Sequence, residues 1–179
     1  MCARFSLLLF AAVFLVPVCA VSQERSSNEY TSDEANNVPI VNWEDTVRKY
    51  ERLVVLDEDD PQHQFNLGYA LVQLDQYSKA LFPLWETARL DPYYWPAFYM
   101  LGACYYYLDL YPQAEQVLRR GSSLERESAY CNYLLGYVYL ELDELEQARD
   151  QYFIVIEYDE DLAGELYEAI HEAEEEVDW

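Results

Sequence analysis

From Trp43 to Val177 the apolar residues recur at the three- and four-residue spacing of amphipathic helices. Short polar or proline-containing segments interrupt this pattern about every 17 residues, as turns between helices would. The pattern predicts eight successive helices, at 43–56, 61–74, 77–90, 95–108, 111–124, 129–142, 145–158 and 162–177. The expected fold class is therefore all-α, built from short helices joined by short turns.

A fixed interval of 34 residues relates three stretches of this pattern. Each stretch carries a Leu-Gly pair in its first helix, a Leu-Asp pair at the end of that helix, and an Ala in its second helix. The recurring residues are Leu67-Gly68, Leu101-Gly102 and Leu135-Gly136, then Leu74-Asp75, Leu108-Asp109 and Leu142-Asp143, then Ala80, Ala114 and Ala148. The chain is therefore a tandem repeat of one helical hairpin.

The repeated glycines Gly68, Gly102 and Gly136 fall in the middle of predicted helices. Glycine there costs about 1 kcal/mol relative to alanine, so its recurrence at equal spacing needs a packing reason. We expect that a Cβ atom at these positions would collide with the second helix of the same hairpin. The repeated alanines would supply the matching small contact on that second helix.

These residues resemble the tetratricopeptide repeat (TPR) family, whose 34-residue pattern has Leu-Gly in the first helix, Ala and an aromatic in the second, and Pro in the link. The resemblance covers three repeats, at 61–94, 95–128 and 129–162. The chain departs from the pattern at the early Trp, which is Gln64, Phe98 and Asn132, and at the later links, where Arg126 and Glu160 replace Pro. The resemblance implies a right-handed α-solenoid of antiparallel helix pairs that binds proteins.

The flanks extend the array. Residues 42–60 align with the second half of a repeat and predict a leading half-repeat helix. Residues 163–179 predict a C-terminal capping helix, with Leu166, Ala169 and Ile170 on one stripe and Glu on the other face. A polar outer face is what the terminal helix of a solenoid needs for solubility.

The first 20 residues have the features of a signal peptide. Arg4 precedes a continuous apolar stretch from Phe5 to Val18, and small residues follow at the spacing that a signal peptidase reads. The stretch is too short to span a bilayer, so an uncleaved anchor is the less favoured alternative. Lipid attachment at Cys19 is also less favoured, because Val18 fits a lipoprotein signal poorly. We expect an exported protein, periplasmic or secreted, without stable membrane insertion after cleavage.

Residues 21–41 are rich in Ser, Asn and Glu and predict a flexible linker. The whole chain has a formal net charge of −23, which becomes −24 on cleavage because Arg4 is the only charged residue removed. Such a surface repels nucleic acid and anionic lipid, and it favours a cationic protein or peptide partner or serves solubility. No basic cluster of the kind that binds nucleic acid occurs.

No catalytic, cofactor-binding or metal-binding constellation is present in the sequence. His63 and His171 lie in different predicted helices, and neither has Cys, Asp or Glu at the spacing of a known metal site. The acidic runs 57–60 and 174–176 lack the ligand order and glycine of a calcium loop. We therefore expect neither an enzyme nor a bound cofactor.

Tyrosine is the informative residue type, with 18 copies. The resemblance implies that one face of each first helix lines a concave groove, and that face is aromatic here. The candidate peptide-binding residues are Phe65, Tyr69, Tyr99, Tyr106, Tyr107, Tyr130, Tyr133 and Tyr137. We expect an open trough facing away from the core, with Tyr99, Tyr106, Tyr133 and Tyr137 as anchors. The alternative is that internal packing, or the last helix folding back, covers these rings.

The groove chemistry best known in this family is a clamp of Lys, Arg and Asn for a C-terminal carboxylate. At the matching positions this chain has Phe65, Tyr69, Met100, Tyr130 and Leu134. The clamp is absent, so recognition of acidic C-terminal tails is not expected.

The sequence favours an exported adaptor that binds a peptide or helical segment in a tyrosine-rich groove. One alternative is a structural or assembly subunit of a cell-envelope complex, with contacts through its convex face or its ends. Another is an enzyme or sugar-binding protein that uses the tyrosine face, although helical repeats of this length rarely enclose a small-molecule pocket.

Cleavage after Ala20 leaves two cysteines, Cys104 and Cys131, in the first helices of adjacent repeats. Export permits a disulfide between them. One lies late in its helix and the other early, whereas a bridge requires Cα atoms within about 7 Å. The sequence therefore allows two interpretations, a disulfide between these cysteines or two free thiols in the core.

Overall fold

The structure is a computed structural model that describes residues 31–32, 39–124 and 129–177. The signal peptide expected at 1–20, most of the linker expected at 21–41, and Arg126 lie outside the described residues. The chain divides into two compact units at Asp91 and Pro92. We call the part ending at Asp91 the N-terminal unit and the part starting at Pro92 the C-terminal unit.

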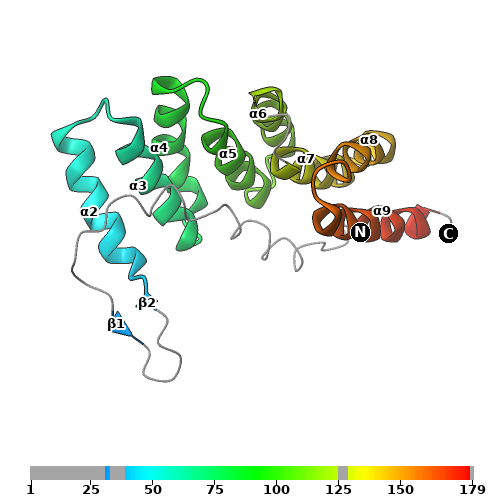
Figure 1. The fold of residues 1–179 in the computed structure, drawn as a ribbon, viewed down its shortest axis with the longest axis horizontal. Coiled ribbons are helices and arrows are strands. Elements are labelled where there is room, and N and C mark those ends of the chain that lie inside the picture. Colours follow the sequence, from blue (N-terminus) through cyan, green and yellow to red (C-terminus); the bar gives the residue numbers. More distant parts are fainter. Residues whose placement is uncertain (1–30, 33–38, 125–128, 178–179) are drawn as a thin grey trace. The chain divides into compact units, whose positions relative to one another are not determined.

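In its described residues the N-terminal unit has three helices, with α3 packed against both of the others (Figure 1). Two-residue strands precede them and pair in antiparallel register, Thr31 opposite Ile40. The elements are β1 (Thr31–Ser32), β2 (Pro39–Ile40), α2 (Trp43–Leu56), α3 (Pro61–Gln73) and α4 (Tyr77–Leu90). The core between the helices is apolar and includes Tyr50, Leu71 and Leu84.

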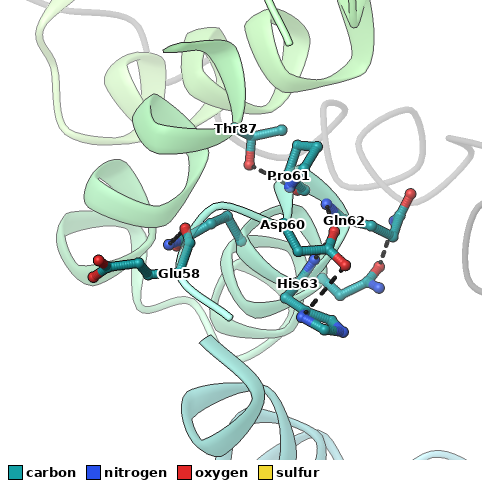
Figure 2. A network of polar contacts seen from close by, with 8 residues as sticks. Glu58, Asp60, Pro61, Gln62, His63 and Thr87 are labelled. Carbon is teal, nitrogen blue, oxygen red and sulfur yellow. Dashed lines mark hydrogen bonds and ion pairs between the residues drawn. The ribbon is translucent and has the colours of Figure 1, made fainter. Parts of the chain in front are cut away.

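A polar network fixes the start of α3 (Figure 2). The Asp60 carboxylate accepts hydrogen bonds from the backbone N–H groups of Gln62 at 2.7 Å and His63 at 3.4 Å, which are otherwise unpaired at a helix start. Pro61 suits the first helical position because it lacks an N–H group. The buried Thr87 hydroxyl donates to the Pro83 carbonyl of its own helix at 2.9 Å and lies 3.5 Å from the Pro61 carbonyl, so this end of α3 packs against α4.

The part of the C-terminal unit that the structure describes has five helices: α5 (Trp95–Tyr107), α6 (Tyr111–Leu124), α7 (Ala129–Glu141), α8 (Leu145–Val155) and α9 (Glu160–Val177). Helix α7 is central, because it contacts α5, α6, α8 and α9. Its side chains are accordingly buried on nearly all sides, from Ala129 to Leu140. The apolar stretch of α7 in the sequence is explained by this position.

The same turn ends the first helix of each pair. After α5 the N–H groups of Asp109 and Leu110 donate to the carbonyls of Tyr106 and Tyr105 at 3.0 and 2.9 Å, which is a Schellman motif. The equivalent bonds follow α3 and α7. The motif requires a left-handed residue, and Asp takes that position in all three turns: Asp75 at φ 55°, Asp109 at φ 57° and Asp143 at φ 59°. These turns produce the three hairpins that the repeat predicts.

The predicted helices agree with the structure except at the junction of α8 and α9. Helix α8 ends at Val155 rather than 158, and α9 begins at Glu160 rather than 162. After α8 the chain forms a tighter turn, in which the N–H of Tyr158 donates to the carbonyl of Val155, three residues earlier, at 3.0 Å. Asp159 then caps α9 by accepting from the N–H groups of Asp161 and Leu162 at 3.1 and 3.0 Å. This local capping shortens the second helix of the third repeat.

The repeated glycines are required by packing, as expected, but the contacts differ from the expectation. A Cβ atom at Gly68 would lie 2.5 Å from Leu84, and one at Gly102 would lie 2.4 Å from Leu118, both in the second helix of the hairpin. The close contact is therefore a leucine rather than the repeated alanine. At Gly136 the contact is Leu166 of α9, at 2.7 Å, and not a residue of α8. The expectation that α8 opposes Gly136 was wrong, because α9 packs directly on α7.

Candidate functional site

The candidate groove residues lie on three first helices that belong to two units. Phe65 and Tyr69 are on α3 in the N-terminal unit. The other six are on α5 and α7, which contact one another in the C-terminal unit: Tyr99, Tyr106, Tyr107, Tyr130, Tyr133 and Tyr137. The residues of α5 and α7 therefore belong to one unit, and those of α3 belong to the other.

Two tyrosines of α7 pack beneath α9. The rings of Tyr133 and Tyr137 lie edge to face with centroids 5.0 Å apart, a favourable geometry for aromatic pairs. The Tyr133 hydroxyl donates to the Glu165 carboxylate at 2.6 Å, and the Tyr137 hydroxyl donates to the Glu165 carbonyl at 3.4 Å. Burial, followed by the hydrogen bond to Glu165, raises the pKa of Tyr133 far above its ordinary value. Both phenols are thus neutral and held by the last helix.

A second aromatic cluster lies at the end of α5. The Tyr106 ring meets those of Tyr107 and Tyr111 at 5.8 and 5.6 Å, both edge to face. The Tyr106 hydroxyl donates to the Glu141 carboxylate of α7 at 3.1 Å. Burial and the nearby negative charge of Glu141 raise the pKa of Tyr106. This bond links the ends of α5 and α7.

A third cluster joins the beginnings of the same two helices. The rings of Trp95 and Tyr130 are stacked, with centroids 6.3 Å apart and planes 5° from parallel. Tyr130 also lies 5.9 Å from the buried ring of Tyr99. Trp95 and Tyr130 are only half-buried. Desolvation raises the pKa of Tyr99 above its ordinary value.

The two aromatic residues of α3 pack within the N-terminal unit. Phe65 and Tyr69 are buried, with ring centroids 6.2 Å apart. Trp43, the first residue of α2, meets Tyr69 edge to face at 5.7 Å. The leading half-repeat thus contributes an aromatic side chain to this face.

The expectation of an open trough was wrong for most of these residues. Six of the eight side chains are no more than 7% exposed: Phe65, Tyr69, Tyr99, Tyr106, Tyr133 and Tyr137. The expectation that Tyr99 and Tyr133 face away from the core was therefore also wrong. The sequence register places these residues on one helix face, but it does not show that α9 covers Tyr133 and Tyr137 or that the rings pack against each other. Only Tyr107 and Tyr130 are half-buried.

Three further residues belong to this face. Trp95 stacks on Tyr130, Glu141 accepts from Tyr106, and Glu165 accepts from Tyr133. The repeat register offered a signal for Glu141, which occupies the same groove position as Tyr107. It offered none for Glu165, because α9 does not follow the 34-residue pattern.

The cysteines are free and buried. A Cβ atom at Gly121 of α6 would lie 2.8 Å from the Cys131 sulfur, so this thiol fills the space left by the glycine. Burial raises the pKa of both Cys104 and Cys131 to about 12. The disulfide considered from the sequence is not formed in the structure. Both thiols are core residues of the unreactive kind.

Among the residues that the structure describes, no three His, Cys, Asp or Glu side chains gather as metal ligands would. Within the same ranges, no helix has both the length and the apolar character to cross a membrane.

The sequence matches no protein-family model. It also matches no curated protein. Solved structures do resemble it. MamA superposes with a TM-score of 0.65 at 21% identity, over 75% of this chain and 90% of MamA.

Two further structures agree. The thermophilic TPR protein TTC0263 of Thermus thermophilus has a TM-score of 0.60 at 24% identity, over 69% of this chain and 71% of TTC0263. PcrH, solved in complex with the chaperone binding region of PopD, has a TM-score of 0.61 at 22% identity, over 68% of this chain and 96% of PcrH. These likenesses confirm the expected fold class, an all-α solenoid-type array of antiparallel TPR-like helix pairs.

Proposed function

We propose that the protein is an exported adaptor that binds a peptide or helical segment of a partner protein on the first-helix face of α5 and α7. The observation that carries this proposal is the stacked, half-buried pair of Trp95 and Tyr130 beside the buried ring of Tyr99. Large rings with polar edges, fixed in place before binding, lose little conformational entropy when a partner docks.

The structure changes the role of the tyrosines within this proposal. Tyr99 is fully buried beside Tyr130, so it acts as a rigid floor rather than as an anchor, and Tyr133 is bonded to Glu165 of α9 instead of facing a partner. The anchors are the half-buried rings of Trp95, Tyr107 and Tyr130, which present surface at either end of the α5–α7 pair. Aromatic residues at the centre of an interface are the side chains that most often dominate its binding energy.

The chemistry of the face supports a cationic partner segment. Glu141 and Glu165 accept hydrogen bonds from tyrosines at this face, and the chain as a whole carries a net charge of −23. Exposed ring faces attract Lys and Arg through cation–π interaction. The same charge disfavours nucleic acid as a partner.

Two other lines support the proposal. The PcrH structure of similar fold contains a bound segment of PopD, which is an instance of peptide binding on a helical array of this size. The first 20 residues have the sequence of a signal peptide, which supports export to the periplasm or the exterior. An adaptor of this kind needs no cofactor and no catalytic group.

The experiment is a calorimetric comparison after the native partner has been identified by affinity capture of the exported chain. Tyr130→Ala and Tyr107→Ala should weaken binding by about 2 kcal/mol or more, the usual threshold for a dominant contact. Phe82→Ala serves as a matched control, because Phe82 is an exposed aromatic residue on α4 in the other unit. Unchanged affinity in both α5–α7 variants would remove this face from the proposal.

A further inference from the structure

Helices α8 and α9 expose large apolar side chains at their outer side. Phe153 is 63% exposed, Tyr167 is 48% exposed and Ile156 is 41% exposed. The sequence predicts a polar, solubilising cap at this end, and such a cap has no need for these residues. This exposure is separate from the face of α5 and α7.

These side chains form one patch across the two helices. The Tyr152 ring lies 5.3 Å from Phe153 on α8 and 5.8 Å from Tyr167 on α9. Ile156 is the residue directly after α8, and its N–H donates to the Tyr152 carbonyl at 3.0 Å, so it continues the helical turn that carries Tyr152 and Phe153.

Gly164 adds an independent observation. Each of the other four glycines would bring a Cβ atom within 3 Å of a neighbouring side chain, whereas a Cβ atom at Gly164 would meet nothing within 4 Å. Glycine in an exposed helix lowers stability relative to alanine, and here no internal contact requires it. Gly164 precedes Tyr167 by three residues, so the bare backbone adjoins the patch. A residue without a side chain allows another backbone to approach closely.

The charge around the patch indicates the kind of partner. Between Glu141 and Glu175 the chain carries fourteen Asp and Glu residues and a single Arg, Arg149. That arginine is paired with Glu146 at 2.8 Å and Glu174 at 2.6 Å. Glu160 and Glu168 lie one turn before and after Gly164 and are exposed. A second copy of this chain would bring the same negative charge to the interface, so a cationic partner is favoured.

We propose that the α8–α9 patch, defined as Tyr152, Phe153, Ile156, Gly164 and Tyr167, is a second docking surface for a Lys- or Arg-rich amphipathic helix of a partner protein. The apolar side chains of that helix rest on Phe153, Ile156 and Tyr167. Its backbone passes close to Gly164, and its basic side chains pair with the surrounding carboxylates. This surface goes beyond the proposed function, since it involves neither α5 nor the tyrosine floor.

The probe is a synthetic 18-residue amphipathic peptide with Leu on one helical face and Lys on the other, titrated into the full exported chain by fluorescence anisotropy. Phe153→Ser should weaken its binding about ten-fold or more, since the anchor is lost and the charge is unchanged. Phe82→Ser, which removes an equally exposed aromatic residue from α4, should leave the affinity unchanged.

The variant Gly164→Gln distinguishes an effect on peptide binding from an effect on folding. Gln is a good helix former, so the variant should raise the Tm by about 2–4 °C. The new side chain should nevertheless weaken peptide binding about ten-fold or more by blocking the approach of the peptide backbone. Opposite signs for stability and affinity rule out misfolding as the cause.

Three results would overturn the proposal. Equal affinity of all variants would mean that general charge attraction is the only interaction. No binding by the native chain would mean that the patch does not accept a basic amphipathic helix. A concentration-dependent dimer in sedimentation, lost in Phe153→Ser, would assign the patch to a second copy of the chain instead.

Discussion

At the scale of single residues, Tyr133 shows how the buried tyrosines combine packing with polarity. Its ring is fully buried between α7 and α9, and its hydroxyl donates to the Glu165 carboxylate at 2.6 Å. A hydrogen bond to a charged group is stronger than one between neutral groups. Tyr133 therefore stabilises the unit in two ways: it buries the apolar surface of its ring, and its hydroxyl attaches α9 to α7.

We expect Tyr133→Phe to lower the free energy of unfolding by about 2 kcal/mol, through the lost hydrogen bond to Glu165. Tyr133→Ala should lower it further, by about 3–5 kcal/mol in total, because it also leaves a cavity. Urea unfolding followed by circular dichroism measures both. The control is Tyr158→Phe, since Tyr158 is half-exposed and its change should stay within about 0.5 kcal/mol. A Tyr133→Ala variant as stable as the native chain would contradict the observed burial.

The same burial predicts loss of stability in alkali. The folded state raises the pKa of seven tyrosines above 10: Tyr69, Tyr99, Tyr106, Tyr111, Tyr133, Tyr137 and Tyr139. A tyrosine whose pKa is higher in the folded than in the unfolded state stabilises the folded protein. This stabilisation is fully present below pH 10, the unfolded pKa, and is lost as the pH rises from 10 toward the folded pKa. A fully buried tyrosine such as Tyr99 that ionises on unfolding removes about 1.4 kcal/mol of stability per pH unit in that range, whereas solvent screening reduces the effect at Tyr111 and Tyr139.

The measurement is a titration from pH 9 to 12 with tyrosinate absorbance at 295 nm and helix content recorded together. We expect helix loss and ionisation of the buried tyrosines to coincide in one cooperative step. In Tyr99→Phe one fewer group titrates, so the stability should fall less steeply with pH. Ionisation of all tyrosines near pH 10 with intact helices would show that the rings are open to solvent.

Sequence reasoning grouped the tyrosines of α5 and α7 by their repeat register, but it expected them to be exposed, whereas most are buried. The 34-residue register is local information, and it fixes which side of α5 or α7 a residue occupies. The Tyr133 hydroxyl is held by Glu165 of α9, a helix outside the repeat. Only the tertiary packing reveals that contact.

At the scale of the helices, two glycines distinguish the effect of packing on stability from the effect of helix propensity. Gly102 and Gly164 both lie within helices, but only Gly102 has a neighbour, Leu118, in the space that a Cβ atom would take. Gly102→Ala should therefore destabilise the chain by about 1–3 kcal/mol through overpacking. Gly164→Ala should stabilise it by about 1 kcal/mol through helix propensity.

Thermal unfolding of the two alanine variants provides the comparison, with each serving as the control for the other. Equal stabilisation by both would mean that the α5–α6 contact at Leu118 is looser than the structure describes. Equal destabilisation would mean that Gly164 has a packing role within the chain.

The helix boundaries were largely predictable because their causes are local. Periodic glycines, the Asp residues of the turns and Pro61 all act within one or two turns of a helix. The end of α8 was not predicted, since the capping of α9 by Asp159 competes with continuation of the preceding helix. The contact of Leu166 with Gly136 was missed for a related reason: it depends on the path of α9 after the repeat ends.

At the scale of the whole molecule, the expected export makes a simple prediction about the mature chain. Protein recovered from its native cells should begin at Val21, because the small residues at 18–20 precede the expected cleavage position. N-terminal sequencing and intact mass give the answer. A chain that retains Met1, or one that begins at a lipid-modified Cys19, would contradict cleavage after Ala20.

The central claim is that a partner segment lies on the first-helix face of α5 and α7. The most direct test replaces Tyr107 or Tyr130 by the photo-reactive residue p-benzoylphenylalanine in the exported chain, with replacement of Phe82 on α4 as the control. Irradiation in the native cells should give a covalent adduct with one partner protein from positions 107 and 130 and none from position 82. Adducts from position 82 alone, or no adduct from either tyrosine position, would contradict the claim.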